Sequence, residues 1–418
     1  MPWAFLAVTL VGAWFTFNAY LPRLRQGPFS VPSFFAGWLT SELPGHHFAW
    51  QLAATVFFVW AGALSAWPGW VGLAITLASW VGLLAMVPLA ARSRAVVERA
   101  LDGALGPGYR ERVTACGRTR LAPEPRGRLL LPLWLRDGAV RVARDIRYAP
   151  EAGRRHLLDL HLPLGELSGA PVLLQIHGGA WMVGNKRQQA LPLMQHLAAR
   201  RWVCVAINYR LSPRATFPDH LVDVKLAVRW IREHVREYGG DPEFLAVTGG
   251  SAGGHLCALA ALTPNDPEYQ PGFERVDTRV QACVPFYGVY DFTDRQGIDR
   301  GTVRFLERYV MKRRLADDPE AFERASPMSR VRPDAPPFFV IHGTHDSLVP
   351  VASARHFVDL LRKTSRQPVV YAEIPYAQHA FEVFHSLRTR HAVDAVGRFL
   401  DYVHEGWRAE RAAAARSG

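Results

Sequence analysis

The stretch VTGGSAGGH at residues 247–255 restricts the fold of this chain more than any other. It sets Ser251 among four glycines and an alanine, after the apolar run FLAV at 244–247 and before the helix-like run LCALAAL at 256–262. A strand, then small residues around a serine, then a helix is typical of a sharp turn with no room for larger side chains. The pattern therefore predicts either tight packing or an accessible nucleophile at Ser251.

Beyond Asp145, short apolar runs alternate with longer amphipathic stretches. Such runs are typical of strands that are buried on both faces of a parallel sheet. The stretch at 217–240 has apolar residues at helical spacing, which predicts a helix, and Gly239 and Gly240 are expected to end that helix. The alternation predicts an α/β domain with a doubly wound, mostly parallel sheet. The runs are PVLLQIH at 171–177, WVCVAINY at 202–209, FLAVTG at 244–249, VQACVPFYG at 280–288, PFFVIHG at 337–343 and VVYAEIPY at 369–376.

Four of these strands end in motifs that carry chemistry. Ligands of doubly wound sheets bind beyond the carboxyl ends of the strands, so reactive residues are expected there. The motifs are HGGAW at 177–181, GGSAGG at 249–254, HGTHDSLVP at 342–350 and AQHAF at 377–381.

These motifs together predict a catalytic triad of Ser251, Asp346 and His379. A serine hydroxyl needs a histidine to take its proton and a carboxylate to hold that imidazole in the right tautomer. Attack on an ester also produces an oxyanion, which backbone N–H groups stabilise. Ala252 is expected to supply one donor. The loop that begins with His177 and Gly178 is expected to supply two more, from Gly179 and Ala180.

The first 90 residues have a different composition from the rest. They carry three formal charges, at Arg23, Arg25 and Glu42, and eight of the thirteen tryptophans, although the net charge of the chain is +12. Three apolar segments, at 3–20, about 48–66 and about 69–90, are each close to the roughly 20 residues that cross a bilayer as a helix. Residues 1–91 are therefore predicted to be a membrane anchor with about three transmembrane helices. If the first segment lies along the interface instead, two remain.

The rest of the chain divides by composition. Residues 92–144 are arginine-rich and are expected to form a juxtamembrane connector, residues 145–406 a catalytic domain, and residues 407–418 a flexible tail. Within the catalytic domain, the segment 291–334 is long enough to fold over the site as a lid. Nucleic-acid binding is not expected, because acidic residues are interspersed and no recognition motif is present.

Arginine placement predicts the orientation in the membrane. Arg23 and Arg25 lie in the first loop, and Arg92, Arg94 and Arg99 follow the third apolar segment. Lys and Arg close to a membrane span stay on the cytoplasmic side. The catalytic domain is therefore expected to be cytoplasmic, in an inner or plasma membrane, with the amino terminus outside in the three-span version.

Metal and cofactor sites are not expected. His255, His342 and His345 lie beside the motifs, but no HExxH or comparable ligand spacing is present. The stretch 179–186 departs from a phosphate-binding loop, because Asn185 separates glycine from lysine. The cysteines form no CxxC pair, and the last three of them are expected to be buried thiols. They are Cys116, Cys204, Cys257 and Cys283.

Residues about 145–404 resemble the hormone-sensitive-lipase-like carboxylesterases of the α/β-hydrolase superfamily, near the prenylcysteine methylesterases and bacterial membrane-anchored esterases. The resemblance implies the α/β-hydrolase fold and a serine esterase that needs no cofactor. Ala180 replaces the common third glycine of the oxyanion loop, and Gly250 stands where an acidic residue often precedes the nucleophile. The motifs that carry the resemblance are HGGAW, NYRLSP at 208–213, FPDHLVDV at 217–224, GGDP at 239–242, GGSAGGH, HGTHDSLVP and QHAF.

The function expected from these features is hydrolysis of short to medium lipophilic esters by a membrane-anchored serine carboxylesterase or lipase, with membrane lipid and the ester as partners. The same triad serves all acyl transfers, so prenylcysteine methylesterase and amide or formamide hydrolase activities stay open. A receptor that retains the fold without turnover is a further alternative. It is disfavoured because no triad residue is missing.

Overall fold

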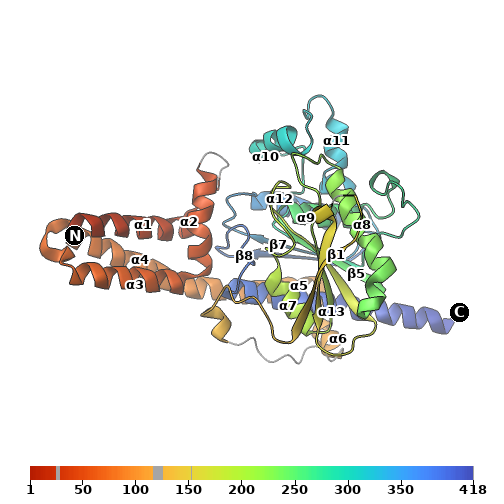
Figure 1. Ribbon diagram of the computed structural model, residues 1–418, viewed down its shortest axis with the longest axis horizontal. Coiled ribbons are helices and arrows are strands. Elements are labelled where there is room, and N and C mark those ends of the chain that lie inside the picture. Colours follow the sequence, from red (N-terminus) through yellow and green to blue (C-terminus); the bar gives the residue numbers. More distant parts are fainter. Residues whose placement is uncertain (25–28, 116–125, 152, 418) are drawn as a thin grey trace.

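The computed structural model describes residues 1–24, 29–115, 126–151 and 153–417, and within them the strands form one eight-stranded sheet (Figure 1). Its order is β1-β2-β4-β3-β5-β6-β7-β8. Strands β1 and β2 pair antiparallel with each other, β2 pairs antiparallel with β4, and the other pairs are parallel. The mostly parallel sheet is confirmed. The strands are β1 (Val140–Arg147), β2 (Leu157–Pro163), β3 (Ala170–Ile176), β4 (Val203–Ile207), β5 (Gly240–Gly250), β6 (Ala282–Phe286), β7 (Phe338–Gly343) and β8 (Val369–Ile374).

All six predicted strands are present, as β3 to β8. The first two strands lie outside the predicted set. Every residue of β1 is exposed or only partly buried, so this strand carries none of the continuous apolar signal of a buried strand. In the central pair, β3 and β5 are in register, with Ile176 beside Gly249. This register brings the HGGAW loop next to the turn at Ser251.

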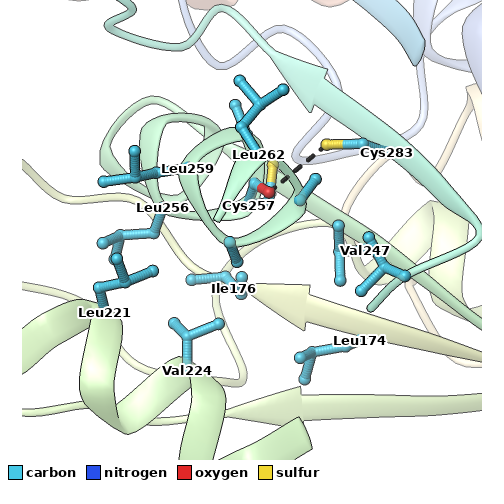
Figure 2. Close-up of a cluster of buried hydrophobic side chains, with 14 of the residues drawn as sticks. Leu174, Ile176, Leu221, Val224, Val247, Leu256, Cys257, Leu259, Leu262 and Cys283 are labelled. Carbon is cyan, nitrogen blue, oxygen red and sulfur yellow. Dashed lines mark hydrogen bonds between the residues drawn. The ribbon is translucent and has the colours of Figure 1, made fainter. Parts of the chain in front are cut away.

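Helices cover both faces of the sheet. Along β3, Leu174 and Ile176 belong to the cluster under α8 (Asp219–His234), α9 (Ala252–Leu262) and α12 (Val351–Thr364), as Figure 2 shows for α8 and α9. Leu173 belongs to the opposite cluster, with α7 (Leu191–Ala199) and α13 (Leu387–Ser417). The alternation follows from the period of two along a strand.

The amino-terminal helices form a bundle that projects from the α/β domain (Figure 1). Helix α2 lies at the end of this bundle that is next to the α/β domain. They are α1 (Pro2–Tyr20), α2 (Ser30–Glu42), α3 (Pro44–Trp60) and α4 (Trp67–Ala91). Within the described residues, two helical stretches are long and apolar enough to cross a membrane, Pro2–Tyr20 and Trp67–Leu105. The second predicted span corresponds to α3, which has 17 residues and ends at Trp60. A turn and a short 3₁₀ helix follow it.

The expected connector contains two helices that pack on the α/β domain. They are α5 (Ser93–Leu105) and α6 (Tyr109–Ala115). Val97 and Leu101 lie one helical turn apart and are buried in the same cluster as α13. Cys116 and residues 117–125 lie outside the described residues. The apolar stripe of this region is narrow, so it was not evident from the arginine-rich composition.

The segment 291–334 contains two short α-helices, α10 (Arg300–Phe305) and α11 (Pro319–Arg324). It is joined to the core by the buried side chains of Phe292, Leu306 and Phe322. The amide of Phe217 also donates to the carbonyl of Val310 at 3.0 Å.

Candidate active site

Ser251 occupies a strained turn between β5 and α9. Its backbone has φ 58° and ψ −121°, and its amide donates to the carbonyl of Phe286 at 3.0 Å. A Cβ atom on Gly253 would lie 2.1 Å from the carbonyl oxygen of Ile176, and one on Gly249 would lie 2.4 Å from the carbonyl oxygen of Gly253. Neither distance is possible without moving backbone. The small residues around the serine are therefore required for β5 and α9 to meet at this turn.

His379 and Asp346 form a buried hydrogen-bonded pair. Nδ1 of His379 lies 2.7 Å from Oδ2 of Asp346, and because a carboxylate can only accept, Nδ1 carries the proton. Nε2 is thereby left free to accept a proton. The other carboxylate oxygen accepts from the amides of Leu348 and Val349 at 2.9 and 2.8 Å.

The environment of Asp346 favours its charged form. Burial raises the pKa of a carboxyl group, but the charge of His379 and hydrogen bonds from His342 and His379 outweigh it. The pKa of Asp346 therefore lies well below its usual range. An ionised Asp346 can hold the imidazole in one tautomer and stabilise it when it becomes positively charged.

The HGGAW loop lies against the serine turn. A Cβ atom on Gly178 would lie 3.1 Å from Cβ of Ser251 and 2.5 Å from the carbonyl oxygen of Gly250. Gly179 and Ala180 have positive φ angles of 112° and 52°. The hydrogen bonds of the described residues include none from the amides of these two residues. The N–H groups of Gly179 and Ala180 therefore have no partner among the described residues, and they follow directly after Gly178, which lies against Ser251.

His177 holds this loop in place. Its ring is buried, stacks on Tyr209 with centroids 4.4 Å apart, and places Nδ1 2.7 Å from the carbonyl oxygen of Gly178. Burial lowers the pKa of His177 to about 4, so the ring is neutral at physiological pH. Its place suits a structural role under the loop.

Within the described part of the chain, no hydrogen bond joins the Ser251 hydroxyl to His379. The side chain of Tyr287 contacts His379 and lies beside Gly250, the residue that precedes Ser251. Its ring centroid lies 4.4 Å from that of His379, and its hydroxyl is 2.6 Å from the Cβ position of Gly250. Catalytic hydrogen bonds are often long before substrate binds.

Helix α2 contributes residues that the sequence patterns did not indicate. The ring of Phe34 meets that of His379 edge to face, with centroids 6.2 Å apart. Nε1 of Trp38 donates to the carbonyl of Ala380 at 2.8 Å. The only signals in the sequence are the aromatic residues of this segment and Glu42, the single acidic residue among the first 90.

A buried ion pair fastens α2 to the α/β domain. Nη1 of Arg388, at the start of α13, lies 3.2 Å from Oε1 of Glu42, and both side chains are fully buried. The same guanidinium donates to the carbonyl of Ser41 at 2.6 Å and lies 3.5 Å from Sδ of Met86 on α4. The hydroxyl of Ser386 donates to the second oxygen of Glu42 at 2.7 Å. The amino-terminal helices and the α/β domain are therefore joined by a buried polar cluster.

The histidines beside the motifs have other partners. Nε2 of His255 lies 2.8 Å from the carbonyl oxygen of Ala325, and Nε2 of His345 lies 3.1 Å from the carbonyl oxygen of Tyr20. Nε2 of His342 lies 3.0 Å from the carbonyl oxygen of Val349 and 3.2 Å from Oδ2 of Asp346. Among the described residues no group of three or more His, Cys, Asp or Glu side chains could hold a metal ion. The predicted buried thiols are confirmed for the cysteines that the structure describes, Cys204, Cys257 and Cys283.

Comparison with known sequences places the chain among esterases. Residues 158–361 match the BD-FAE family. The chain is 48% identical over 409 residues to the protein named "Probable carboxylic ester hydrolase LipM" of Mycobacterium tuberculosis, covering 96% of this chain and 93% of that protein. It is 28% identical to the isoprenylcysteine alpha-carbonyl methylesterase ICME of Arabidopsis thaliana, covering 62% and 61% of the two chains.

The α/β domain also resembles solved structures. A bifunctional GH43-CE protein of Bacteroides eggerthii superimposes with a TM-score of 0.54 and 27% identity, over 62% of this chain and 35% of that one. The match with LipM spans nearly the whole chain, so the shared sequence extends into the amino-terminal helices.

Proposed function

Because the chain belongs to the α/β-hydrolase esterase family and is a carboxylic-ester hydrolase, we propose that it is a membrane-anchored serine esterase that hydrolyses short to medium lipophilic esters. Ser251, His379 and Asp346 are its proposed catalytic residues. The observation that carries the proposal is the His379–Asp346 hydrogen bond at 2.7 Å. This pair follows β8 and β7, at the same edge of the sheet as the strained turn at Ser251 that follows β5.

The proposed reaction has two acyl transfers. Nε2 of His379 takes the proton of the Ser251 hydroxyl while Oγ attacks the ester carbonyl, and the amides of Gly179, Ala180 and Ala252 stabilise the oxyanion. Collapse breaks the bond to the alkoxy group, which leaves as an alcohol with the proton from His379. Water then attacks the acyl-enzyme with His379 again as base, which releases the carboxylic acid and restores Ser251.

Membrane anchoring is supported by the inside-out composition of the bundle. Many of its buried positions hold small or polar residues, including Gly12, Thr16, Thr55, Gly72 and Ser79. Thr16 and Ser79 bond across α1 and α4 at 2.6 Å. The outward positions are large and apolar, which is the arrangement of helices whose outer solvent is lipid. Exposed side chains of this kind are Trp3, Val11, Trp14, Phe17, Val56, Phe57, Trp60, Trp67, Trp70, Val81 and Leu84.

The preference for lipophilic esters is supported by the place of α2. This helix joins the bundle to the site and presents Phe34 to the ring of His379. An acyl chain bound to Ser251 would therefore meet an apolar wall that belongs to the proposed membrane anchor. The segment 291–334 is proposed to be a second covering element.

A substrate panel tests this function on the detergent-solubilised full-length protein. It contains esters of graded acyl length, the matched amides, and a methyl ester of a prenylated cysteine. Highest kcat/KM on short to medium acyl esters is expected. Activity confined to the amides would contradict the proposal, and a preference for the prenylcysteine ester would favour the methylesterase alternative.

Replacing Phe34 by alanine is expected to lengthen the preferred acyl chain. The change removes an apolar wall beside His379, so the ratio of kcat/KM for long over short esters should rise by about tenfold, in the range for one altered pocket contact. Phe35→Ala is the matched control, because the Phe35 side chain is 61% exposed on the same helix. Identical profiles for both variants would show that Phe34 does not limit the acyl site.

The proposed orientation has the catalytic domain in the cytoplasm. The amino terminus lies at the far end of the bundle (Figure 1). Arg92 directly precedes α5, which packs on the α/β domain, and this agrees with the arginine rule. Arg25 lies outside the described residues. A carboxy-terminal reporter that is active only in the cytoplasm should therefore be active, and one that requires export should be silent. The reverse result would overturn the orientation.

A further inference from the structure

The catalytic centre contains a buried acid that the triad mechanism does not use. Glu382 follows the catalytic histidine by three residues and is 2% exposed. The hydroxyl of Tyr287, at the end of β6, donates to its carboxylate oxygens at 2.5 Å. No other side chain of the described residues donates to this carboxylate.

Tyr287 fills the space that a side chain at position 250 would occupy. Its hydroxyl, Cε2 and Cζ atoms all lie within 3.0 Å of the Cβ position of Gly250, the residue before the nucleophile. The same ring packs on His379 with centroids 4.4 Å apart and an interplanar angle of 55°. One buried phenol therefore contacts both the base of the nucleophile turn and the catalytic imidazole.

We propose that Tyr287 and Glu382 form a positioning pair for His379. Glu382 orients the phenol, the phenol fixes the plane of the imidazole, and the carboxylate charge stabilises the imidazolium that forms when Ser251 loses its proton. Gly250 is the residue that leaves room for this arrangement. The proposal rests on the serine-esterase mechanism above, and it assigns roles to two residues outside the triad.

Several charged or titratable groups face Glu382. They are His379 after β8, Tyr287 after β6, and Glu42 on α2, which is itself paired with Arg388 of α13. The charge of Asp346, after β7, acts on Tyr287. Burial is the largest influence and raises the pKa of Glu382 to about 7, opposed by the hydrogen bond from Tyr287 and by the charge of His379. The carboxyl group is thus neutral in mildly acidic solution and charged in mildly basic solution.

The pH dependence of Glu382→Gln separates positioning from structural support. Glutamine keeps an acceptor for Tyr287 and is neutral at every pH. Below about pH 7 the side chain at position 382 is neutral in both wild type and variant, so their kcat values should be similar. Above about pH 7 only the wild type carries the negative charge. Its kcat should then be higher by about 10- to 100-fold, which is the cost of a misplaced catalytic group. KM on a short soluble ester should change little.

Tyr287→Phe provides a second variant that keeps the ring and its volume. It should lower kcat with little change in KM, again more at high pH. The controls are Tyr371→Phe and Glu373→Gln, a second hydrogen-bonded tyrosine–glutamate pair at 2.9 Å on β8, and these should match wild type. A wild-type to Glu382→Gln ratio that is constant across pH, or a Tyr287→Phe variant with wild-type kcat, would overturn the pair. An inactive wild type would instead refute the proposed esterase mechanism.

Discussion

Loss of Ser251 or His379 is expected to lower kcat on esters by about 10⁶-fold, and Asp346→Asn by about 10⁴-fold, because the residues of the proposed triad should act as one unit. The variants are Ser251→Ala and His379→Ala, and the double variant should lose little more than either single one. The changes at Ser251 and His379 have the largest expected effects, since they remove the proposed nucleophile and the proposed base.

The triad measurement needs two controls. Ser365→Ala, at the carboxyl end of α12, removes a serine hydroxyl on the segment that leads into the amino end of β8 and should keep wild-type kcat. Thermal unfolding should show that each triad variant remains folded. Losses that add up in the double variant would mean that Ser251 and His379 do not share one reaction step.

Replacing Arg388 by methionine is expected to destabilise the whole chain by about 3 to 5 kcal/mol, the usual cost of leaving one partner of a buried ion pair uncompensated. Arg388 is fully buried and contacts Glu42, Ser41 and Met86, so its loss affects α2 and α4 together. The measurement is the free energy of unfolding of the detergent-solubilised protein.

A surface ion pair serves as the matched comparison for Arg388. Arg355→Met removes a pair with Glu373 in which the arginine side chain is 53% exposed, and it should cost about 1 kcal/mol or less. Equal effects of the two variants would show that the joint between α2 and the α/β domain contributes little to stability.

The parts of the fold that could be predicted from the sequence are those with local signals. The strands β3 to β8 are mostly apolar because both faces of a parallel sheet are largely buried, and GGSAGG is restricted by steric contacts at the crossing of β5 and α9. Because reactive loops follow the carboxyl ends of parallel strands, locating the strands also located Ser251, Asp346 and His379.

Helix α2 could not be predicted in the same way. Its buried face includes Ser33, Phe34, Gly37 and Ser41, which show no apolar stripe. That face packs on residues more than 300 positions later in the chain, such as Ala380 and Arg388. Its placement depends on these long-range contacts, so no window of the local sequence contains the information.

Two features of the sequence partly indicate the Tyr287–Glu382 pair. Gly250 lacks the side chain that often precedes the nucleophile, and Glu382 lies between the aromatic residues Phe381 and Phe384. An acid in an apolar run is a sign of a buried carboxyl group. Only the fold shows that Tyr287 connects these two observations.

Covalent labelling by a fluorophosphonate probe tests the central assignment most directly. The probe should react once with the detergent-solubilised full-length protein, and mass spectrometry of the digested adduct should locate it on Ser251. Ser251→Ala should remain unlabelled while keeping the thermal unfolding transition of wild type. Labelling that persists in Ser251→Ala, or that maps to another residue of the wild-type protein, would contradict the account.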